Sequence, residues 1–588
     1  MNRYFLLFLV GMALLPVLPT PEFWITQANY IGLFSIVALG LVLLTGVGGM
    51  TSFGQAAFVG LGAYATSYLS TVWGISPWLG LFAGVGVSLL VALVLGGLTM
   101  RLSGHYLPLG TIAWGLSFFY LFGNLEWLGK FDGISGIAPL ELLGRPLRSA
   151  QEIYYLIWTV VALSVVLLQN LLNSRPGRAI RALKGGVVMA EAMGARTAWL
   201  KVVCFLIAAV LASVSGWLYA HMQRSVNPTP FGLNAGIEYL FMAVIGGAGS
   251  VWGAILGSGL VLLLKDELQT LLPRLFGEAG NFETIVLGLL LVALLQYAHS
   301  GLWPLLVGLV PERWRRQLAP LPPADAEALP VRERPRAGET LLEVDGARKE
   351  FGGLVAVNDM RFDVRAGEVM GLIGPNGAGK STMFNLITGV LQVTRGAVRY
   401  RGQEIQSLPS REIVQRGVAR TFQHVKLLGH MSVLENVALG AHLRGQAGVL
   451  RSMLRLNRGE EARLLAEAQR QLERVGLAQL MHVPAGSLAL GQQRTLEIAR
   501  ALCCDPTLLL LDEPAAGLRY KEKQALAALL SKLRSEGMSV LIVEHDMDFV
   551  MNLCDRLVVM EFGTLIAKGV PSEVQQNPAV LEAYLGGV

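Results

Sequence analysis

Residues Glu368 to Gly389 read EVMGLIGPNGAGKSTMFNLITG. An apolar run leads into the pattern GxxxxGK[ST] and then into a helix-forming segment, which is the strand–loop–helix context that this pattern requires. Glycines in such a loop let backbone N–H groups turn toward phosphate oxygens, and the N-terminus of the following helix adds positive potential. The stretch therefore predicts a phosphate-binding loop in an α/β domain.

The loop has the residue types that hold a nucleotide triphosphate. We expect Lys380 to reach the β- and γ-phosphates and Ser381 to ligate Mg²⁺. The residues expected to bind the nucleotide here are Gly374, Pro375, Asn376, Gly377, Ala378, Gly379, Lys380, Ser381 and Thr382.

Two further apolar strands end in polar residues that suit phosphoryl transfer. In PTLLLLDEPAAGL the strand ends at Asp512 and Glu513, and in SVLIVEHDMDFV it ends before His545. Parallel strands deliver such side chains to their carboxyl edge, where nucleotides bind in α/β sheets. We expect Asp512 to hold Mg²⁺, Glu513 to orient or deprotonate the attacking water, and His545 to reach the γ-phosphate.

The first half of the chain has a different character. The whole chain of 588 residues is 53% hydrophobic and 15% charged, whereas soluble domains carry about 25% charged residues. Apolar stretches long enough to cross a bilayer lie near residues 4–20, 30–48, 55–72, 77–99, 106–123, 153–172, 202–221, 238–264 and 284–308. These predict a helical membrane domain with about eight to ten spans.

The charges orient this domain. The loop from Asn173 to Lys201 holds six basic residues against Glu191, which places it in the cytoplasm by the positive-inside rule. The first twenty residues could be a signal peptide, but no small-x-small cleavage site follows, so we expect a retained membrane helix. The formal charge of +6 fits basic cytoplasmic loops. Nucleic-acid binding is not expected, because no basic run is interleaved with aromatic residues.

A segment rich in proline and in charges of both signs separates the two halves. Residues 311–340 contain no apolar period and read as an extended linker. The sequence therefore predicts a membrane domain over 1–310, a linker over 311–340 and a soluble domain over 341–588. The four cysteines form no metal-spaced pair and are expected to be reduced packing residues.

The motifs of the soluble half, in this order, resemble the ATP-binding subunit of ABC transporters. The stretch from Leu488 to Gln492 reads LALGQ and stands where that family has its LSGGQ signature, so the resemblance implies that Leu488, Ala489, Gly491 and Gln492 close over ATP held by a second ATPase domain. It also implies that Gln423 senses Mg²⁺ and that Phe351 stacks on adenine. Two positions depart from the family, since Ala489 replaces the usual serine and Arg519 the usual Asp or Asn.

More of the chain resembles one branch of that family. The stretches GVARTFQHVKLLGHMSVLENVALG and GVPSEVQQNPAVLEAYLG look like the ATPase of importers for branched-chain, hydrophobic amino acids, and GMTSFGQAAFVGLGAYA and IEYLFMAVIGGAGSVWGAILG are similar to their permease. The basic loop contains AEAMGARTAWLK, in which Glu191 and Gly194 match the cytoplasmic loop that docks on the ATPase. A loop lying on lipid headgroups is the alternative.

The resemblance implies a fusion of one permease and one ATPase in an ATP-driven importer. Such an importer needs a second permease, a second ATPase, each separate or fused, and a periplasmic solute-binding protein, in the bacterial inner membrane with the ATPase in the cytoplasm. The expected cofactors are ATP and Mg²⁺. The alternative solutes are urea, short amides or another small molecule. A membrane-anchored ATPase without transport and an exporter are further alternatives, and the docking loop argues against both.

Overall fold

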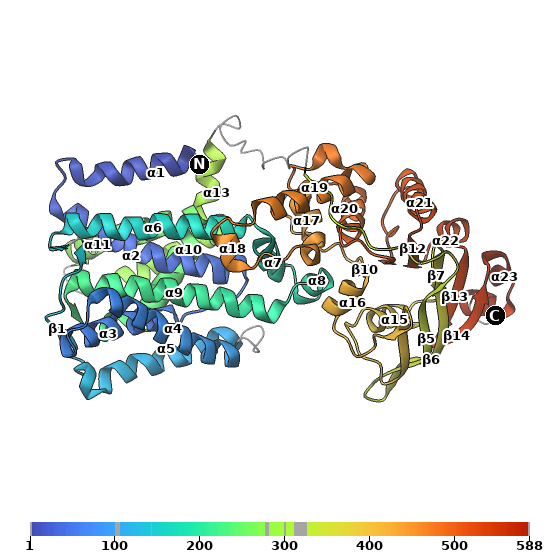
Figure 1. Cartoon of the computed structure of the whole chain (residues 1–588), viewed down its shortest axis with the longest axis horizontal. Coiled ribbons are helices and arrows are strands. Elements are labelled where there is room, and N and C mark those ends of the chain that lie inside the picture. The colour runs from blue at the N-terminus through green and yellow to red at the C-terminus, as the bar shows by residue number, and fades with distance from the viewer. Residues whose placement is uncertain are drawn as a thin grey trace. The chain divides into compact units, whose positions relative to one another are not determined.

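The computed structural model describes residues 3–99, 106–142, 144–276, 282–298, 301–310 and 326–585. The chain forms two compact units, one of Met1–Leu172 with Ala198–Gln317 and one of Asn173–Thr197 with Leu318–Val588. Each unit is described by itself (Figure 1). The basic segment Asn173–Thr197 thus packs with the C-terminal unit, although both of its neighbours in the chain belong to the first.

The first unit is helical. Its helices are α1 (Arg3–Leu14), α2 (Glu22–Leu41), α3 (Gln55–Val72), α4 (Pro77–Thr99), α5 (Tyr106–Asn124), α6 (Ala150–Leu172), α9 (Thr197–Gln223), α10 (Leu233–Gly247), α11 (Val251–Phe276), α12 (Phe282–Tyr297) and α13 (Leu302–Leu309). Shorter pieces are η1 (Leu15–Val17), the π-helical η2 (Val42–Val47), η3 (Glu126–Leu128), η4 (Thr229–Phe231) and the two-residue strands β1 (Ile134–Ser135), β2 (Glu141–Leu142), β3 (Arg145–Pro146) and β4 (Ser225–Val226).

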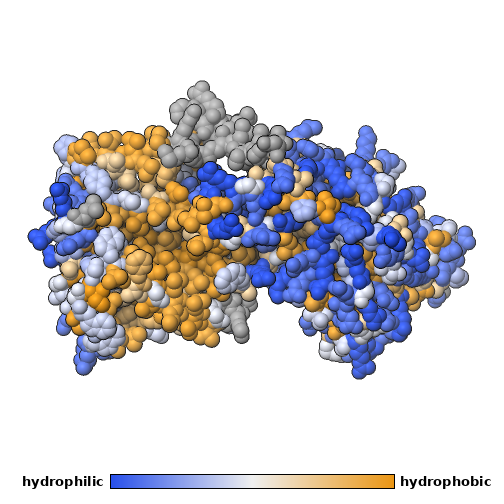
Figure 2. Space-filling view, viewed as in Figure 1, coloured by the Kyte–Doolittle hydropathy of each residue, from blue (hydrophilic) through white to orange (hydrophobic). Residues whose placement is uncertain are grey.

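Five helices in the described residues are long and apolar enough to cross a bilayer, or up to six if a bent pair counts as one span. The five are Glu22–Val47, Pro77–Leu98, Tyr106–Asn124, Ala150–Leu172 and Thr197–Gln223, and the pair α10 and α11 is bent by 119°. This number is below the expected eight to ten, because several apolar stretches form shorter helices or, as at 238–264, break at a turn. Figure 2 shows hydrophobic side chains over most of the visible face of this unit, with hydrophilic residues at its left end, as lipid contact along the helices requires.

Close helix packing explains some of the glycines of this unit. A Cβ added at Gly216 of α9 would lie 1.9 Å from the backbone oxygen of Val59 in α3, and one at Gly62 of α3 would lie 2.2 Å from the oxygen of Ser213 in α9. No side chain fits at either position. Small residues let α3 and α9 approach backbone to backbone, as helices in lipid commonly do.

The second unit contains two sheets. The larger has the order β10-β11-β12-β7-β13-β14 and is parallel except for the last pair, and the smaller has the antiparallel order β6-β5-β8-β9. The strands are β5 (Thr340–Phe351), β6 (Leu354–Arg365), β7 (Val369–Ile373), β8 (Arg395–Tyr400), β9 (Gln403–Glu404), β10 (Val418–Arg420), β11 (Leu508–Asp512), β12 (Ser539–Val543), β13 (Arg556–Glu561) and β14 (Thr564–Gly569).

Helices complete this unit. They are α7 (Arg175–Lys184), α8 (Val187–Ala192), α15 (Lys380–Ile387), α16 (Ser410–Arg416), α17 (Val433–Gly440), α18 (Val449–Met453), α19 (Arg458–Arg474), α20 (Leu490–Leu502), α21 (Tyr520–Ser535), α22 (Met547–Leu553), α23 (Pro571–Gln575) and α24 (Pro578–Leu585), with the 3₁₀ turns η5 (Ala441–Arg444), η6 (Ala478–Leu480) and η7 (Ala485–Ser487).

The parallel sheet determines where the site can form. Strands β7, β11 and β12 are fully buried and read as continuous apolar runs, as strands covered on both faces do. They are paired in register, with Asp512 opposite Val543 and Val543 opposite Leu372. Their carboxyl ends therefore lie along one edge of the sheet.

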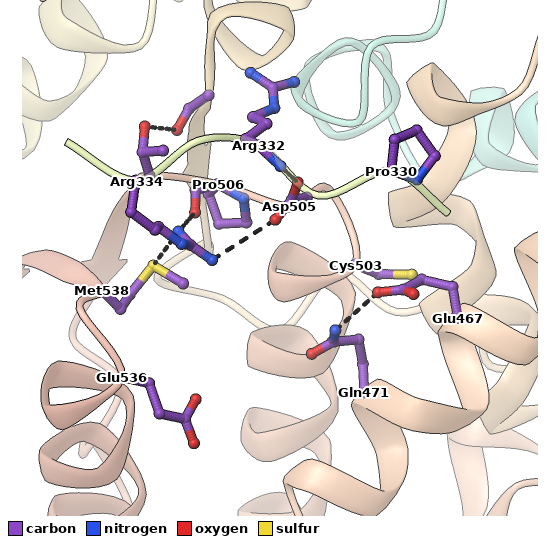
Figure 3. A network of polar contacts seen from close by, with 12 residues as sticks. Pro330, Arg332, Arg334, Glu467, Gln471, Cys503, Asp505, Pro506, Glu536 and Met538 are labelled. Carbon is purple, nitrogen blue, oxygen red and sulfur yellow. Dashed lines mark hydrogen bonds and ion pairs between the residues drawn. The ribbon is translucent and has the colours of Figure 1, made fainter. Parts of the chain in front are cut away.

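The described part of the expected linker is bound to the second unit. Leu329 is 4% exposed and belongs to a hydrophobic cluster built mainly from α17, α19 and α20. The Arg332 N–H donates to Asp505 Oδ2 at 2.6 Å, and the Arg334 guanidinium pairs with Asp505 at 3.6 Å and donates to the Pro506 carbonyl (Figure 3). Residues 326–336 thus form a strap that is bound to the ATP-binding unit. Residues 311–325 of the expected linker lie outside the described part.

The strap gives a stability prediction. Replacing Leu329 with Ala removes a buried side chain and should destabilise the second unit by about 2–5 kcal/mol. The matched control is Val331→Ala, because Val331 is 71% exposed and its replacement should change stability by less than about 0.5 kcal/mol.

All four cysteines are buried and unbridged. In a Cys204→Ala background, heat-induced maleimide labelling therefore reports unfolding of the second unit alone. Equal midpoints for both variants would show that the strap is not part of the core.

Candidate functional site

A cavity of about 390 Å³ opens at the carboxyl edge of the parallel sheet. Its lining residues are Leu354, Val355, Ala356, Asn376, Gly377, Ala378, Gly379, Lys380, Ser381, Thr382, Gln423, Glu513, His545 and Phe562. The loop after β7 contributes most of the floor, and the ends of β10, β11 and β12 contribute one side. The cavity is thus built from segments that lie far apart in the sequence.

The loop adopts the geometry that its glycines permit. Gly379 has φ +97°, and a Cβ there would lie 2.4 Å from the Ala356 carbonyl, so only glycine fits. The Lys380 ammonium donates to the carbonyls of Gly374 and Pro375, both at 2.8 Å. Burial lowers the pKa of Lys380, while the Glu513 and Asp512 carboxylates oppose that shift. The Lys380 side chain therefore lies curled over the loop, with its ammonium on two of the loop's own carbonyls.

Three of the expected catalytic side chains lie in contact with one another. His545 Nε2 lies 2.8 Å from Glu513 Oε1, and Gln423 Nε2 donates to Glu513 Oε2 at 3.2 Å. Glu513 has the left-handed φ of +48°, which turns its side chain out of the strand direction after β11. Gln423, Glu513 and His545 all line the cavity.

Asp512 lies behind this group. It is 4% exposed, and its Oδ1 atom has no hydrogen-bond partner in the described part of the chain. Its other oxygen lies 3.8 Å from Arg420. Burial raises the pKa of Asp512, and Arg420 opposes that rise. A buried carboxylate oxygen without a partner fits a cation or its water shell, because such a group otherwise costs about 1–3 kcal/mol.

Not every residue expected at the nucleotide lines the cavity. Phe351 ends β5, is 46% exposed and lies under the Lys349 ammonium at 5.1 Å, outside the lining. Adenine stacking by Phe351 stays a prediction. Instead Phe562 and the start of β6 line the cavity. Sequence reasoning missed these residues, because they come from a separate sheet and from a turn that carry no motif.

The residues of the signature form the start of α20. Ala489 is the N-cap and provides no side-chain cap, and its N–H donates instead to Gln492 Oε1 at 3.2 Å. A Cβ added at Gly491 would lie 2.5 Å from Glu522, and Glu522 accepts from the N–H of Arg519 at 2.8 Å. Ala489 and Arg519 thus lie on neighbouring segments. Leu488, Ala489, Gly491 and Gln492 are outside the lining of the cavity that this chain forms around its own loop.

Helix α20 also holds the segment that carries Gln423. The Arg494 guanidinium donates to the Phe422 carbonyl at 3.1 Å, and Arg500 donates to the Lys426 carbonyl at 2.7 Å. Glu497 accepts from the Lys426 N–H at 2.9 Å. Glu497 and Arg500 are 2% and 1% exposed and pair at 3.2 Å. The backbone on both sides of Gln423 is therefore fixed by one buried polar cluster, which the sequence did not suggest.

The basic segment Asn173–Thr197 packs on α16, α17, α18 and η5 within the second unit. Met189 and Ala190 of α8 are fully buried. Gly194 has φ +82°, and a Cβ there would lie 2.2 Å from Leu443. Glu191 accepts from the Thr197 hydroxyl at 2.7 Å, so its carboxylate braces the segment itself.

Three ion pairs hold this segment. Arg178 pairs with Glu461, Arg181 pairs with Glu435 at 3.0 Å, and Arg175 pairs with Glu460 at 3.9 Å. Burial alone would raise the pKa of Glu435, but Arg181 and the Ser432 N–H together hold that pKa below its usual value. The docked segment is therefore charge-complementary to α17 and α19.

Comparison with known proteins gives the class to which this arrangement belongs. Residues 357–516 match the model of the ABC transporter ATPase. Residues 23–295 match that of the branched-chain amino acid transport system permease component, and residues 564–588 that of the branched-chain amino acid ATP-binding cassette transporter. The chain is thus an ABC transporter protein that carries permease and ATPase together.

The C-terminal half is similar to several individual proteins. The chain is 45% identical over 249 residues to the high-affinity branched-chain amino acid transport ATP-binding protein BraF of Pseudomonas aeruginosa, a match that covers 42% of this chain and 98% of BraF. It is 43% identical to LivG of Salmonella typhimurium, over 42% of this chain and 98% of LivG. The crystal structure of the ADP conformation of the cassette MJ1267 matches at 34% identity and a TM-score of 0.38, over 42% of this chain and 99% of that one.

The chain belongs to the branched-chain amino acid ABC transporter family. It is a membrane protein that binds ATP and couples ATP hydrolysis to transport. Membership implies partner permease and ATPase subunits and a solute-binding protein.

The buried cluster on α20 gives the prediction for this site. Replacing Arg500 with Met leaves the Glu497 carboxylate buried without its cation, which should cost about 3–5 kcal/mol. Adding Glu497→Gln should recover part of that loss, because the remaining partner is then neutral. Thiol labelling in the Cys204→Ala background measures both variants. A double variant as unstable as Arg500→Met alone would show that charge burial is not the cause.

Proposed function

We propose that this chain supplies one permease and one ATPase to an importer of branched-chain or other hydrophobic amino acids. The observation that carries the proposal is that models of this one transport system match both halves of a single chain. Both relatives of the ATPase half named above bear that solute class in their names. An importer of urea, short amides or another small solute in the same family is the second candidate.

The proposed assembly contains a second permease, a second ATPase and a periplasmic solute-binding protein. It lies in the bacterial inner membrane with the ATPase unit in the cytoplasm, as the basic residues of Asn173–Thr197 favour. Uptake of labelled leucine into vesicles that hold the purified assembly, with binding protein outside and ATP inside, tests this. ATP-dependent uptake of urea or acetamide without leucine would replace the first candidate by the second.

We propose that the cavity holds ATP with Mg²⁺. Ser381 and Asp512 would hold the metal, which neutralises charge on the β- and γ-phosphates when bound. Lys380 leaves the carbonyls of Gly374 and Pro375 and binds the phosphate oxygens instead. The backbone N–H groups from Gly377 to Thr382 and the start of α15 bind the remaining phosphate charge.

In this proposal, Glu513 orients the attacking water and accepts its proton. The Glu513 carboxylate already lies in contact with His545 and Gln423, so both can hold it in place and then turn toward the γ-phosphate. Gln423 is the residue through which the permease influences hydrolysis. Buried contacts with α20 fix the backbone on both sides of Gln423, and α20 packs on α17, which binds Arg181 of the docked segment.

The variant Glu513→Gln should lower ATP turnover by about 10²- to 10⁴-fold, the usual contribution of a general base, while ATP binding persists. The measurement is steady-state hydrolysis and nucleotide retention in an assembly whose partner ATPase is also inactivated. Undiminished hydrolysis would place the base elsewhere.

We further propose that the two ATP sites of the assembly are unequal. Ala489 lacks the hydroxyl that a serine would donate to the γ-phosphate of the partner's nucleotide, a bond to a charged group worth roughly 1.5–3 kcal/mol. That is about tenfold to a hundredfold in rate if the bond forms only in the transition state. Inactivating Glu513 here, and the corresponding residue of the partner, separates the sites. Equal residual rates that Ala489→Ser leaves unchanged would contradict the inequality.

We propose that Asn173–Thr197 transmits closure of the ATPases to the permease. Gly194→Ala combines left-handed backbone strain with displacement of Leu443, and should lower binding-protein-stimulated hydrolysis severalfold while basal hydrolysis persists. Gly186→Ala is the matched control, since Gly186 has φ +113° but no atom within 4 Å of its added Cβ. Equal loss of stimulation in both variants would assign the effect to backbone strain rather than to docking.

A further inference from the structure

The second unit exposes three leucines on a short amphipathic stretch, residues 449–458. We call it the leucine–arginine segment. It comprises α18 and the turn that leads into α19. Its leucines Leu450, Leu454 and Leu456 are 72%, 56% and 65% exposed. Leu450 and Leu454 stand one helical turn apart and share a face.

In this segment the polar side chains are buried and the leucines are exposed, which is the reverse of the usual pattern at a soluble surface. Its polar residues Ser452 and Asn457 are 1% and 8% exposed, and the Asn457 amide donates to the Ser452 hydroxyl at 3.2 Å. The turn is closed by backbone bonds, such as the Leu456 N–H to the Arg451 carbonyl at 2.9 Å. The segment is therefore folded by polar contacts inside and presents its leucines outward, which marks an apolar contact surface.

The charges of the segment all have one sign. Arg451, Arg455 and Arg458 are exposed, and none of them forms an ion pair within the part of the chain that the structure describes. The sequence has no acidic residue from Ala441 to Gly459. Leucines flanked by unpaired arginines are the composition that binds anionic membrane surfaces, because the leucines enter the apolar boundary while the arginines bind phosphate groups.

The chain also limits how far this segment can lie from a bilayer. Helix α6 is a candidate membrane span that ends at Leu172. Three residues further on, the Arg175 guanidinium donates to the Ala447 carbonyl at 2.8 Å, just before α18 begins. Three residues span at most about 11 Å, and the headgroup region is roughly 5–8 Å deep on each side of the hydrocarbon. The chain connection therefore keeps Arg175, and the residues that it binds just before α18, near the headgroup layer.

We infer that the leucine–arginine segment is a membrane contact of the ATPase unit. Its leucines enter the boundary between headgroups and acyl chains, and its arginines bind anionic lipid headgroups. The contact holds the ATPase at a fixed height against the bilayer beside the docked segment Asn173–Thr197. This inference requires only that the chain is a membrane protein and does not depend on which solute it carries.

The test is a depth measurement on the full chain in its assembly, reconstituted into vesicles of phosphatidylglycerol and phosphatidylethanolamine. The native cysteines are buried, so a nitroxide label can be attached selectively to Leu450→Cys. Leu581→Cys is the control, because Leu581 is 45% exposed on α24. At position 450 we expect collisions with oxygen to exceed those with a water-soluble nickel chelate severalfold, and at position 581 the reverse.

Two outcomes would overturn the inference. A label at position 450 as accessible to the nickel chelate as the label at 581 would show that the leucines face water. An immobile label that neither reagent reaches would show that a protein subunit covers them.

A second comparison tests the arginines. Replacing phosphatidylglycerol with phosphatidylcholine should move the label toward water, and Arg451→Gln with Arg455→Gln should do the same. A depth unaffected by either change would show that anionic headgroups are not the partner.

Discussion

The buried pair of Glu497 and Arg500 is the constraint on which the site depends. Two charges that are almost fully buried would be costly in isolation, and each is hydrogen-bonded to the backbone of Lys426 as well as paired with the other. Together with Arg494, they fix the ends of the segment that presents Gln423 to Glu513. The position of the Gln423 side chain in the cavity is thus set by a helix whose first residues lie outside the lining of that cavity.

The same helical part of the unit receives the segment that comes from between two membrane helices. Helix α17 binds Arg181 through Glu435 and packs on α20, which in turn holds the Gln423 backbone. A continuous chain of contacts therefore joins Asn173–Thr197 to the Glu513 carboxylate. Movement of that segment and rearrangement at Glu513 are mechanically linked if these elements move as one body.

The sequence predicted those parts of the site that are fixed by short-range rules. Lys380 and Ser381 follow from a strand–loop–helix pattern, and Glu513 and His545 follow from the ends of buried parallel strands. Residues brought in by tertiary packing carried no such signal, as with Phe562 in a turn and Arg500 in a helix that reads only as amphipathic. The burial of Leu329 could not be predicted, because a single apolar residue in a proline-rich stretch shows no hydrophobic periodicity. Helix lengths in lipid were also harder to predict, since a turn at 248–250 interrupts one continuous apolar run.

The insertion of Asn173–Thr197 into the ATPase unit has a consequence for biosynthesis. Its partners Glu435 and Glu461 follow more than 250 residues later in the chain. At about 5–20 residues per second, the ribosome makes them roughly 10–60 s after the segment itself. During that interval Met189 and Ala190 have no core to enter, and the nascent permease must wait for its own C-terminal half. Because the two halves are fused, this interval is limited to the translation of one chain. Every permease domain is also synthesised together with an ATPase domain on which its loop can fold.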